Sequence, residues 1–414
     1  MHIIASTLVS ALGSGKKPHI DAWTEGKSGL SQETNFHQQM PEIITFLGEV
    51  KGVESVTLPK ALEAFLCRNN QLAWKTLQTE GFNNKVEVLI EKFGPNRIGL
   101  VVGTSTSGIA TTEDIFRHKL DADSYSDSYC YQKTQQMDSL AQFCCQALNI
   151  EGPSFVISTA CSSSAKVFAV AQRWLNAGIV DAVVVGGVDS LCLTTVHGFN
   201  ALGLVSPTVC KPLDESRDGI NIGEAGGFML LSHAKFSDET SSSPVEIAGV
   251  GESSDAYHIS TPHPEGEGAQ LAMLAASEQA NIGIDELDYI NLHGTATPSN
   301  DLSEVSGVSH LMSEKSSTWI SSTKGFTGHT LGAAGITEII FCQWMLEEQM
   351  VPANLNLMNL DSILVQKLAR SNISVPLEAL HLSGTNRKLQ YVMSNSFGFG
   401  GNNASVILKR ESVE

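Results

Sequence analysis

Positive charge is scarce in this sequence. Its 414 residues include 26 lysines and arginines against 44 aspartates and glutamates, which gives a formal net charge of −18. Nucleic acids and anionic membranes attract basic surfaces, so this balance argues against either of them as the main partner. An acidic protein partner would need a local basic patch.

Paired cysteines and long apolar runs are also missing. The eight cysteines form no C-x-x-C pair and mostly stand among apolar residues, which is typical of free thiols in a reducing cytoplasm. No apolar run approaches the roughly 18 residues that span a bilayer. The first residues, MHIIASTLVSALGSGKK, lack a basic region before a long apolar run, so we expect a first strand there and not a signal peptide. These absences predict a soluble, cytoplasmic protein.

Short runs rich in valine and isoleucine alternate with longer helical patterns. The strands that we predict from these runs are residues 97–103, 154–159, 182–188, 289–294 and 319–323. Continuous apolar strands separated by helices are typical of a parallel sheet that is buried on both faces. Apolar spacing of three and four residues marks helical faces at 167–174 and, less regularly, at 339–346. The sequence therefore predicts an α/β fold.

The least regular stretch, SDETSSSPVE at residues 237–246, separates two parts of similar design. In the first part, ISTACSSSAKVFAV runs from a strand through a serine-rich turn into a helix. In the second part, ISSTKGFTGHTLGAAGITEII does the same through a glycine-rich turn. We therefore predict two related halves, residues 1–240 and 241–414.

Three segments that look like ligand motifs do not fit the motifs. GSGKK near the N-terminus lacks the first glycine of a phosphate loop, because Ser10 stands in its place, and SFGFGGNN fails the dinucleotide pattern at Asn403. His258, His263 and Glu265 lie in a proline-broken loop, without the helical i, i+4 spacing of a metal site. We expect neither a nucleotide nor a metal ion.

Four other segments place reactive side chains at turns that follow strands or in glycine-rich loops. Cys161 stands at a helix N-terminus, where free N–H groups and the helix dipole favour a thiolate, although buried structural thiols are far more common. His293 ends an apolar strand, where it could equally be a histidine bonded to the backbone. Lys324 and His329 share a glycine-rich turn after another strand. The glycines of residues 394–405 suit a turn that offers N–H groups to an anion, or an ordinary loop with two core phenylalanines.

In order and spacing, these segments resemble the motifs of the elongating β-ketoacyl-acyl-carrier-protein synthases. The motifs are TACSSS, KPLDESRDGINIGEAGG, SDAYHISTPHPEG, HGTATPSND, KGFTGHTLGAAG and NSFGFGGNNA. The resemblance extends over about residues 90–410. It implies the thiolase fold, with five αβαβα layers built from two similar halves, usually as a homodimer. It also implies an acyltransferase that makes 3-oxoacyl-carrier protein in fatty-acid or polyene biosynthesis.

The resemblance implies a catalytic role for each motif. Cys161 would hold the acyl chain as a thioester, and the backbone N–H groups of Cys161 and Phe399 would form its oxyanion hole. His293 and His329 would donate hydrogen bonds to the malonyl thioester as carbon dioxide leaves. Lys324 would support both histidines. Neutral histidines beside a thiolate suit this chemistry, because the developing enolate needs donors rather than a strong base.

Other residues are expected to support the substrates. Glu338 is the expected partner of Lys324, Thr295 and Thr297 are expected to bind the phosphopantetheine arm, and Phe397 and Phe399 the acyl chain, with Phe399 as its gate. No bound cofactor is needed, because the thioester on the phosphopantetheine of the acyl carrier protein is already activated.

The cysteine and two histidines also favour one branch of the superfamily. Initiating synthases pair the cysteine with a histidine and an asparagine, and thiolases use a second cysteine. Chain-length-factor partners lack the nucleophile, so the presence of Cys161 predicts an active elongating subunit rather than a non-catalytic partner.

Some residues depart from the common pattern of the family. Asn402 stands where threonine is usual, and GEAGG replaces GEGAG. Residues 186–206 resemble the ketosynthases of aryl polyene pigment clusters, which extend conjugated chains together with a chain-length factor. Housekeeping fatty-acid elongation and this specialised role both remain open, as do a homodimer and a heterodimer.

The carrier protein is acidic, so its docking site on this acidic chain should be locally basic. Lys211, Lys60 and Arg68 are the residues that we expect to form this patch.

Overall fold

The first half of the chain forms a mixed sheet. The computed structural model describes residues 1–117, 130–234 and 244–411. The main strands of this sheet are β1 (His2–Ser10), β4 (Ile98–Gly103), β5 (Ser154–Ile157), β6 (Ala182–Asp189) and β8 (Ala225–Ser232). They lie in the order β5-β4-β6-β8-β1. The first three strands in this order are parallel, whereas β8 is antiparallel to both β6 and β1.

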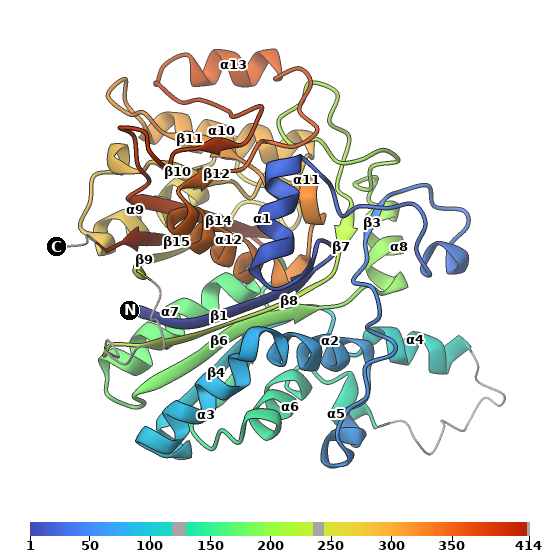
Figure 1. Ribbon diagram of the computed structural model, residues 1–414. Helices are drawn as coiled ribbons and strands as arrows, with labels where there is room; N and C mark the ends of the chain where they lie inside the picture. The colour runs from blue at the N-terminus through green and yellow to red at the C-terminus, as the bar shows by residue number, and fades with distance from the viewer. Residues whose placement is uncertain (118–129, 235–243, 412–414) are drawn as a thin grey trace.

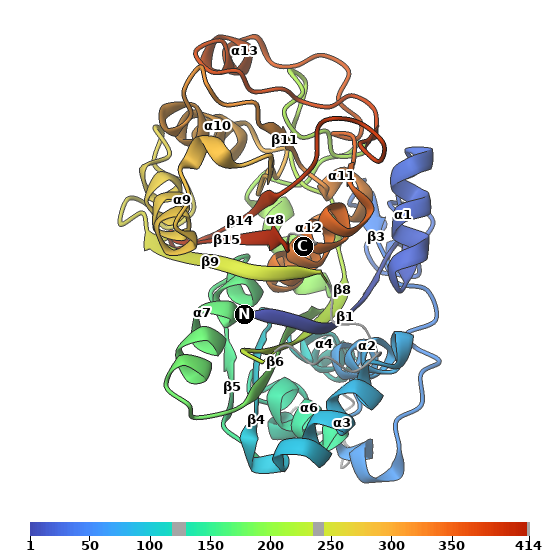
Figure 2. The same cartoon turned by 60° about the vertical axis from the view of Figure 1, so that its left-hand side comes forward.

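The second half repeats this arrangement. Its strands are β9 (Val245–Ser254), β10 (Tyr289–Asn291), β11 (Trp319–Ser321), β14 (Tyr391–Gly398) and β15 (Asn402–Arg410). They lie in the order β11-β10-β14-β15-β9, with the same sequence of parallel and antiparallel neighbours. The two sheets meet where His2 of β1 pairs with Glu246 of β9, and Figure 2 shows these two edge strands side by side. The expected similarity of the halves is therefore confirmed, whereas the expected boundary near residue 240 lies outside the described residues.

Helices cover both faces of each sheet (Figure 1). The central layer holds α7 (Ser163–Asn176) and α12 (Ala334–Glu348), whose apolar side chains pack against both sheets in one large core. On the outer face of the first sheet lie α2 (Arg68–Leu77), α3 (Phe82–Phe93) and α6 (Ser139–Leu148). On the outer face of the second lie α9 (Glu267–Ala280) and α10 (Pro298–Leu311). This is the αβαβα order that the sequence predicted.

Smaller elements complete the described part of the chain. The helices are α1 (Lys16–Glu25), α4 (Ile109–Arg117), α5 (Tyr131–Thr134), α8 (Leu193–Ala201), α11 (Lys324–Thr327) and α13 (Ser362–Leu368). The short strands are β2 (Gly13–Ser14), β3 (Leu47–Gly48), β7 (Ile222–Gly223), β12 (Met350–Val351) and β13 (Leu380–His381). Among 3-10 helices, η2 (Lys60–Phe65) and η6 (Leu331–Ala333) adjoin residues discussed below. No helix in the described ranges is long and apolar enough to cross a bilayer.

The two central helices approach closely at their N-termini. A Cβ atom at Gly335 would lie 2.5 Å from the backbone nitrogen of Ala165, so this contact requires glycine. The Ser164 hydroxyl accepts a hydrogen bond of 2.9 Å from the Ile336 N–H. This packing brings the turn before α7 next to the turn before α12.

The strands predicted from apolar runs are parallel within each sheet, as expected. The sheets are mixed because β8 and β15, which those runs did not predict, add antiparallel pairs. One expectation about the strands needs correction. Strand β5 is not buried on both faces, because it is the last strand of its sheet and has one neighbour in the described chain. Its Phe155 is 36% exposed.

Candidate active site

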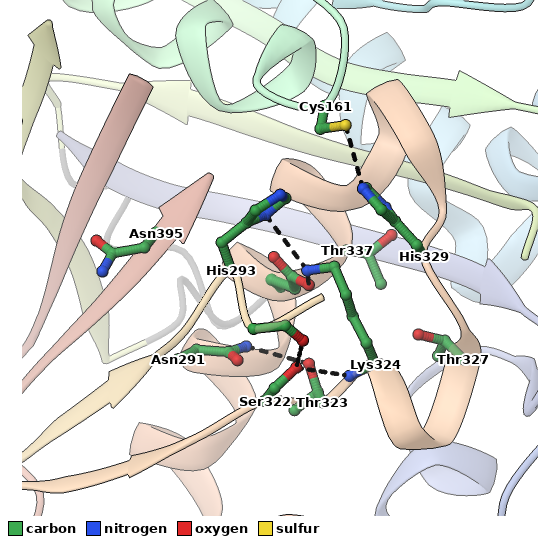
Figure 3. Close-up of polar contacts among 12 residues, drawn as sticks. Cys161, Asn291, His293, Ser322, Thr323, Lys324, Thr327, His329, Thr337 and Asn395 are labelled. Atoms are coloured by element: carbon green, nitrogen blue, oxygen red, sulfur yellow. Dashed lines mark hydrogen bonds and ion pairs between the residues drawn. The ribbon is translucent and has the colours of Figure 1, made fainter. Parts of the chain in front are cut away.

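Reactive residues from both halves meet in the space next to the central helices (Figure 3). Cys161 lies between β5 and α7, and His293 follows β10. Lys324 begins α11, and His329 follows the same short helix. All four side chains are buried, and Figure 3 shows the rings of both histidines near the cysteine sulphur.

A tight turn presents Cys161 to this site. The preceding residue, Ala160, has a φ of 51°, a left-handed conformation that costs free energy for a residue with a side chain. The Ser163 hydroxyl donates to the Ala160 carbonyl oxygen at 2.5 Å and accepts from the Thr159 N–H at 2.9 Å. These bonds hold the strained turn, and the Cys161 side chain remains 7% exposed.

His329 contacts the cysteine directly. Its Nε2 atom lies 3.1 Å from Sγ of Cys161. Its Nδ1 atom accepts a hydrogen bond of 3.2 Å from the Leu331 N–H, so Nδ1 carries no proton. In a neutral ring the proton is therefore on Nε2, and His329 donates toward the sulphur.

The neutral ring of His293, like that of His329, accepts at Nδ1 and donates at Nε2. Its Nδ1 atom lies 3.5 Å from Nζ of Lys324, which is a donor, so the proton of the neutral ring is on Nε2. The His293 and His329 rings lie 5.3 Å apart at an angle of 83°. Two N–H groups can thus serve one acceptor in the pocket.

Burial keeps both histidines neutral. Desolvation lowers the pKa of His293 and of His329 well below the usual histidine value, and the nearby charge of Lys324 lowers it further. Neutral imidazoles are hydrogen-bond donors that leave no net charge in a dry site.

The expected thiolate is corrected by the structure. Burial, together with the nearby charge of Asp189, raises the pKa of Cys161 to about 12. These effects outweigh Lys324 and the N–H groups of Phe399 and Cys161, which lower the pKa. The helix α7 begins two residues later, at Ser163. The resting cysteine is therefore a neutral thiol, although both N–H groups expected in the oxyanion hole face its sulphur.

Lys324 pairs with Glu338, as the sequence predicted. Its Nζ atom donates to Oε1 of Glu338 at 2.5 Å, and both side chains are almost fully buried. Burial raises the pKa of Glu338 to about 7, against the opposing effect of Lys324. The pair places a fixed positive charge beside His293 at the base of the site.

A cleft leads from the surface to these side chains. Cys161 and both histidines line it. Thr295 and Thr297 line it as well, with their hydroxyls 2.9 Å apart, and so do Phe397 and Phe399. A long, narrow group could enter along the threonines and reach the cysteine at the bottom.

Comparisons with known proteins show the family of the chain. The β-ketoacyl synthase N-terminal domain matches residues 56–236, and the β-ketoacyl synthase C-terminal domain matches residues 245–358. The 3-oxoacyl-[acyl-carrier-protein] synthase 2 of Vibrio cholerae is 33% identical over 97% of this chain and 97% of its own. That of Staphylococcus aureus is 32% identical over 76% and 75%. The chain belongs to the β-ketoacyl synthase family.

Solved structures give the same assignment. The chain is 35% identical to the ketosynthase ApeO from Xenorhabdus doucetiae, solved in complex with its chain length factor ApeC, with a TM-score of 0.83 and 99% and 97% of the two chains covered. A β-ketoacyl synthase from Burkholderia phymatum has a TM-score of 0.83 over 99% of both chains, and its 24% identity bears on the fold alone. The thiolase fold and the ketosynthase class of acyltransferases, both predicted from sequence, are confirmed.

The ketosynthase site also has the geometry of a metal cluster. The ligand atoms of Cys161, His293 and His329 all lie within 4.8 Å of one another. Both Nε2 atoms carry protons, however, and the charge of Lys324 opposes a second cation there. These donors suit a thioester oxygen better than a metal ion.

Outside the active site, the described chain has one other group of possible metal ligands, and the loop with His263 does not form one. His2, Glu246 and Glu411 form the other group with compact ligand atoms, at the junction of the two sheets. His263 lies 3.6 Å from Glu267 in an ion-pair contact and joins no such group with His258 and Glu265.

One of the three expected docking residues is wrong. The Arg68 side chain is 13% exposed, and its guanidinium donates to both carboxylate oxygens of the buried Glu224. The guanidinium also lies 3.6 Å from a carboxylate oxygen of Glu49. Its positive charge is therefore paired with carboxylates inside the protein and is not available to a docking partner. Lys60 is exposed at the start of η2, and Lys211 is half-buried.

A carboxylate that no sequence motif indicated holds the His293 turn. Glu304 of α10 is buried and accepts the backbone N–H of His293 and that of Gly294, each at 2.8 Å. Asn395 of β14 donates to the same carboxylate at 3.2 Å. The acidic residue eleven positions after His293 was visible in the sequence, but nothing indicated that it folds back onto the turn.

Glu304 should make stability depend on pH. Burial raises its pKa from 4.5 to about 7, although the hydrogen bonds to it lower the pKa. Between pH 4.5 and about pH 7 the unfolded chain releases this proton, whereas the folded protein keeps it. The free energy of unfolding therefore falls as the pH rises through this range. The fall should be about 3 kcal/mol for this group. Denaturant unfolding at several pH values should show it in the wild type, relative to Glu304→Gln; parallel profiles of the two proteins would contradict the assignment.

Proposed function

We propose that the protein is a β-ketoacyl-acyl-carrier-protein synthase that condenses a malonyl thioester with an acyl chain held on Cys161. The observation that carries this proposal is the contact of 3.1 Å between Sγ of Cys161 and the protonated Nε2 of His329, with a second neutral donor, His293, beside it. A nucleophile and two donors at the bottom of a cleft match the needs of a decarboxylative condensation.

The first step transfers the acyl chain. Sγ of Cys161 bonds to the thioester carbon, the bond from that carbon to the pantetheine sulphur breaks, and the departing sulphur takes the proton that Cys161 loses. The N–H groups of Cys161 and Phe399 stabilise the oxyanion that forms in between. Because the resting thiol is neutral, its proton leaves as the new bond forms, and the N–H of His329 and the N-terminus of α7 stabilise the charge on sulphur at that stage.

The second step makes the new carbon–carbon bond. The malonyl thioester loses carbon dioxide, and the electron pair forms an enolate whose oxygen accepts hydrogen bonds from Nε2 of His293 and of His329. The enolate carbon attacks the acyl carbon, the bond to Sγ breaks, and the sulphur takes up a proton from solvent water. The product is a 3-oxoacyl chain, two carbons longer, on the carrier.

The remaining site residues support these steps. Burial keeps both histidines neutral, and the charge of Lys324, fixed by Glu338, adds to this effect. Thr295 and Thr297 bind the phosphopantetheine arm in the cleft. Phe397 and Phe399 contact the acyl chain, and Phe399 packs on Phe199 of α8 at 5.7 Å, where it can act as a gate.

The partners of the enzyme are an acyl carrier protein and a second ketosynthase-like subunit. Lys211 and Lys60 are the cations that we propose for carrier docking. Among the described strands β5 pairs only with β4, so its other edge can offer backbone groups to a second subunit. The free thiols of all eight cysteines fit a protein of the cytoplasm, and no bound cofactor takes part.

A second, more specialised role is favoured by one observation. The chain is 35% identical to ApeO, a ketosynthase that was solved with its chain length factor. In this role the protein would pair with a chain-length-factor-like subunit and extend polyene chains of the aryl polyene type, rather than serve housekeeping fatty-acid elongation.

Intact-mass analysis tests both roles. Wild-type protein is incubated with saturated and polyenoyl carrier proteins, with and without candidate partner subunits, and then with malonyl carrier protein. We expect an acyl adduct and then a 3-oxoacyl product. Turnover of saturated chains by the protein alone would favour housekeeping elongation, whereas polyenoyl turnover only with a partner would favour the specialised role. No adduct with any chain or partner would overturn the proposed function.

A further inference from the structure

A buried carboxylate lies between the two halves beside the nucleophile. Asp189 ends β6 and is 0% exposed. Among the described residues no lysine, arginine or histidine forms an ion pair with it. A buried charge without a cation costs free energy unless many donors solvate it, so its neighbours indicate its purpose.

The donors to Asp189 come from opposite halves of the protein. From the loop after β4, the hydroxyls of Thr104 and Thr106 donate to Oδ1 at 2.6 and 2.8 Å, and the Ser105 hydroxyl donates to Oδ2 at 2.5 Å. From the second half, the backbone N–H of Gly332 donates to Oδ2 at 2.6 Å. The backbone N–H groups of Ser105 and Thr106 also donate to Oδ1, at 2.8 and 2.9 Å, so the loop after β4 fixes the carboxylate. The N–H of Gly332 is the group that the fixed carboxylate holds in turn.

Gly332 belongs to the turn that carries His329. It lies in η6, directly after Leu331, whose N–H fixes the proton of His329 on Nε2. Leu331 has a φ of 52°, a strained conformation that persists only where the surroundings hold it. Gly332 itself packs closely against the carboxylate, because a Cβ atom at this position would lie 2.7 Å from Oδ2 of Asp189.

We propose that Asp189 is a positioning residue of the condensation, which holds the Gly332 N–H and thereby keeps the His329 imidazole against Cys161. This inference rests on the proposed function. Asp189 does not touch the substrate, and it acts through the strained turn at Leu331. The carboxylate of the first half thus aligns a donor of the second half.

Two substitutions disturb the bond between Gly332 and Asp189 from opposite sides, and Asp189→Asn also alters the bonds from the loop after β4. Asp189→Asn replaces an acceptor oxygen with an amide, and Gly332→Ala pushes the carboxylate away. With the condensation assay, we expect each to lower kcat about 100-fold while KM changes little, since a small misplacement of a catalytic group has this effect. The loss in the double variant should be smaller than the product of the two single losses, because both changes remove the bond between Gly332 and Asp189.

A matched control separates positioning from stability. Asp288, which directly precedes β10, is half-buried and accepts the backbone N–H groups of Gln390 and Tyr391. Asp288→Asn should lower the melting temperature and leave kcat unchanged. If Asp189→Asn does not fold, Gly332→Ala tests the same bond. A folded variant of either kind with wild-type kcat, or strictly additive losses, would overturn the inference, whereas an inactive wild type would overturn the proposed function instead.

Discussion

Replacing Cys161 with alanine is expected to remove the acyl adduct and to lower condensation by about 10⁴-fold or more, since loss of a covalent nucleophile leaves only binding and oxyanion stabilisation. The contact with His329 and the two N–H groups that face Sγ give this sulphur a role that the other cysteines do not have. Intact-mass measurement after incubation with acyl carrier protein, followed by a product assay, checks both effects.

A second buried cysteine provides the control for this prediction. Cys144 of α6 is fully buried in the outer core of the first half, and burial raises its pKa well above the usual value, much as for Cys161. Cys144→Ala should keep both the adduct and the activity. An adduct that persists in Cys161→Ala would show that another residue is the nucleophile.

The fold was predictable where one local pattern decides the structure. The apolar runs of β4 and β6 form strands within a residue of the predicted bounds, and the strand–turn–helix patterns around Cys161 and Lys324 occupy equivalent places in the two sheets. The antiparallel strands β8 and β15 were missed because glycine and polar residues interrupt their apolar pattern. The exposure of β5 depends on its place in the sheet, which is a property of the whole topology.

The site was predictable for the residues that belong to the recognised sequence motifs. Cys161, His293, His329 and the pair of Lys324 with Glu338 meet as the resemblance implied. Glu304 and Asp189 were missed for one physical reason: their partners are backbone N–H groups of turns, which have no sequence signature. The errors on Arg68 and on the thiolate have another cause, because burial and pairing decide whether a charge is exposed or stable, and a linear sequence shows neither.

His293→Ala should separate the two half-reactions. The contact that Cys161 makes in the site is with His329, so acyl transfer to the cysteine should continue and the adduct should still form. Decarboxylation of the malonyl thioester should fall by about 10² to 10³-fold, because one of two donors to the enolate oxygen is lost. Intact mass follows the adduct, and release of carbon dioxide from malonyl carrier protein follows the second step.

The hydrogen-bonding character of the side chain, rather than its bulk, should decide the outcome. His293→Asn keeps an N–H donor at this position and should recover part of the decarboxylation rate, whereas His293→Leu, with similar size and no donor, should match alanine. Equal rates for asparagine and leucine would show that His293 fills space instead of stabilising the enolate. A wild-type rate of decarboxylation in His293→Ala would leave His329 as the donor that carries the step, and the charge of Lys324 at 3.5 Å from His293 would then need another purpose.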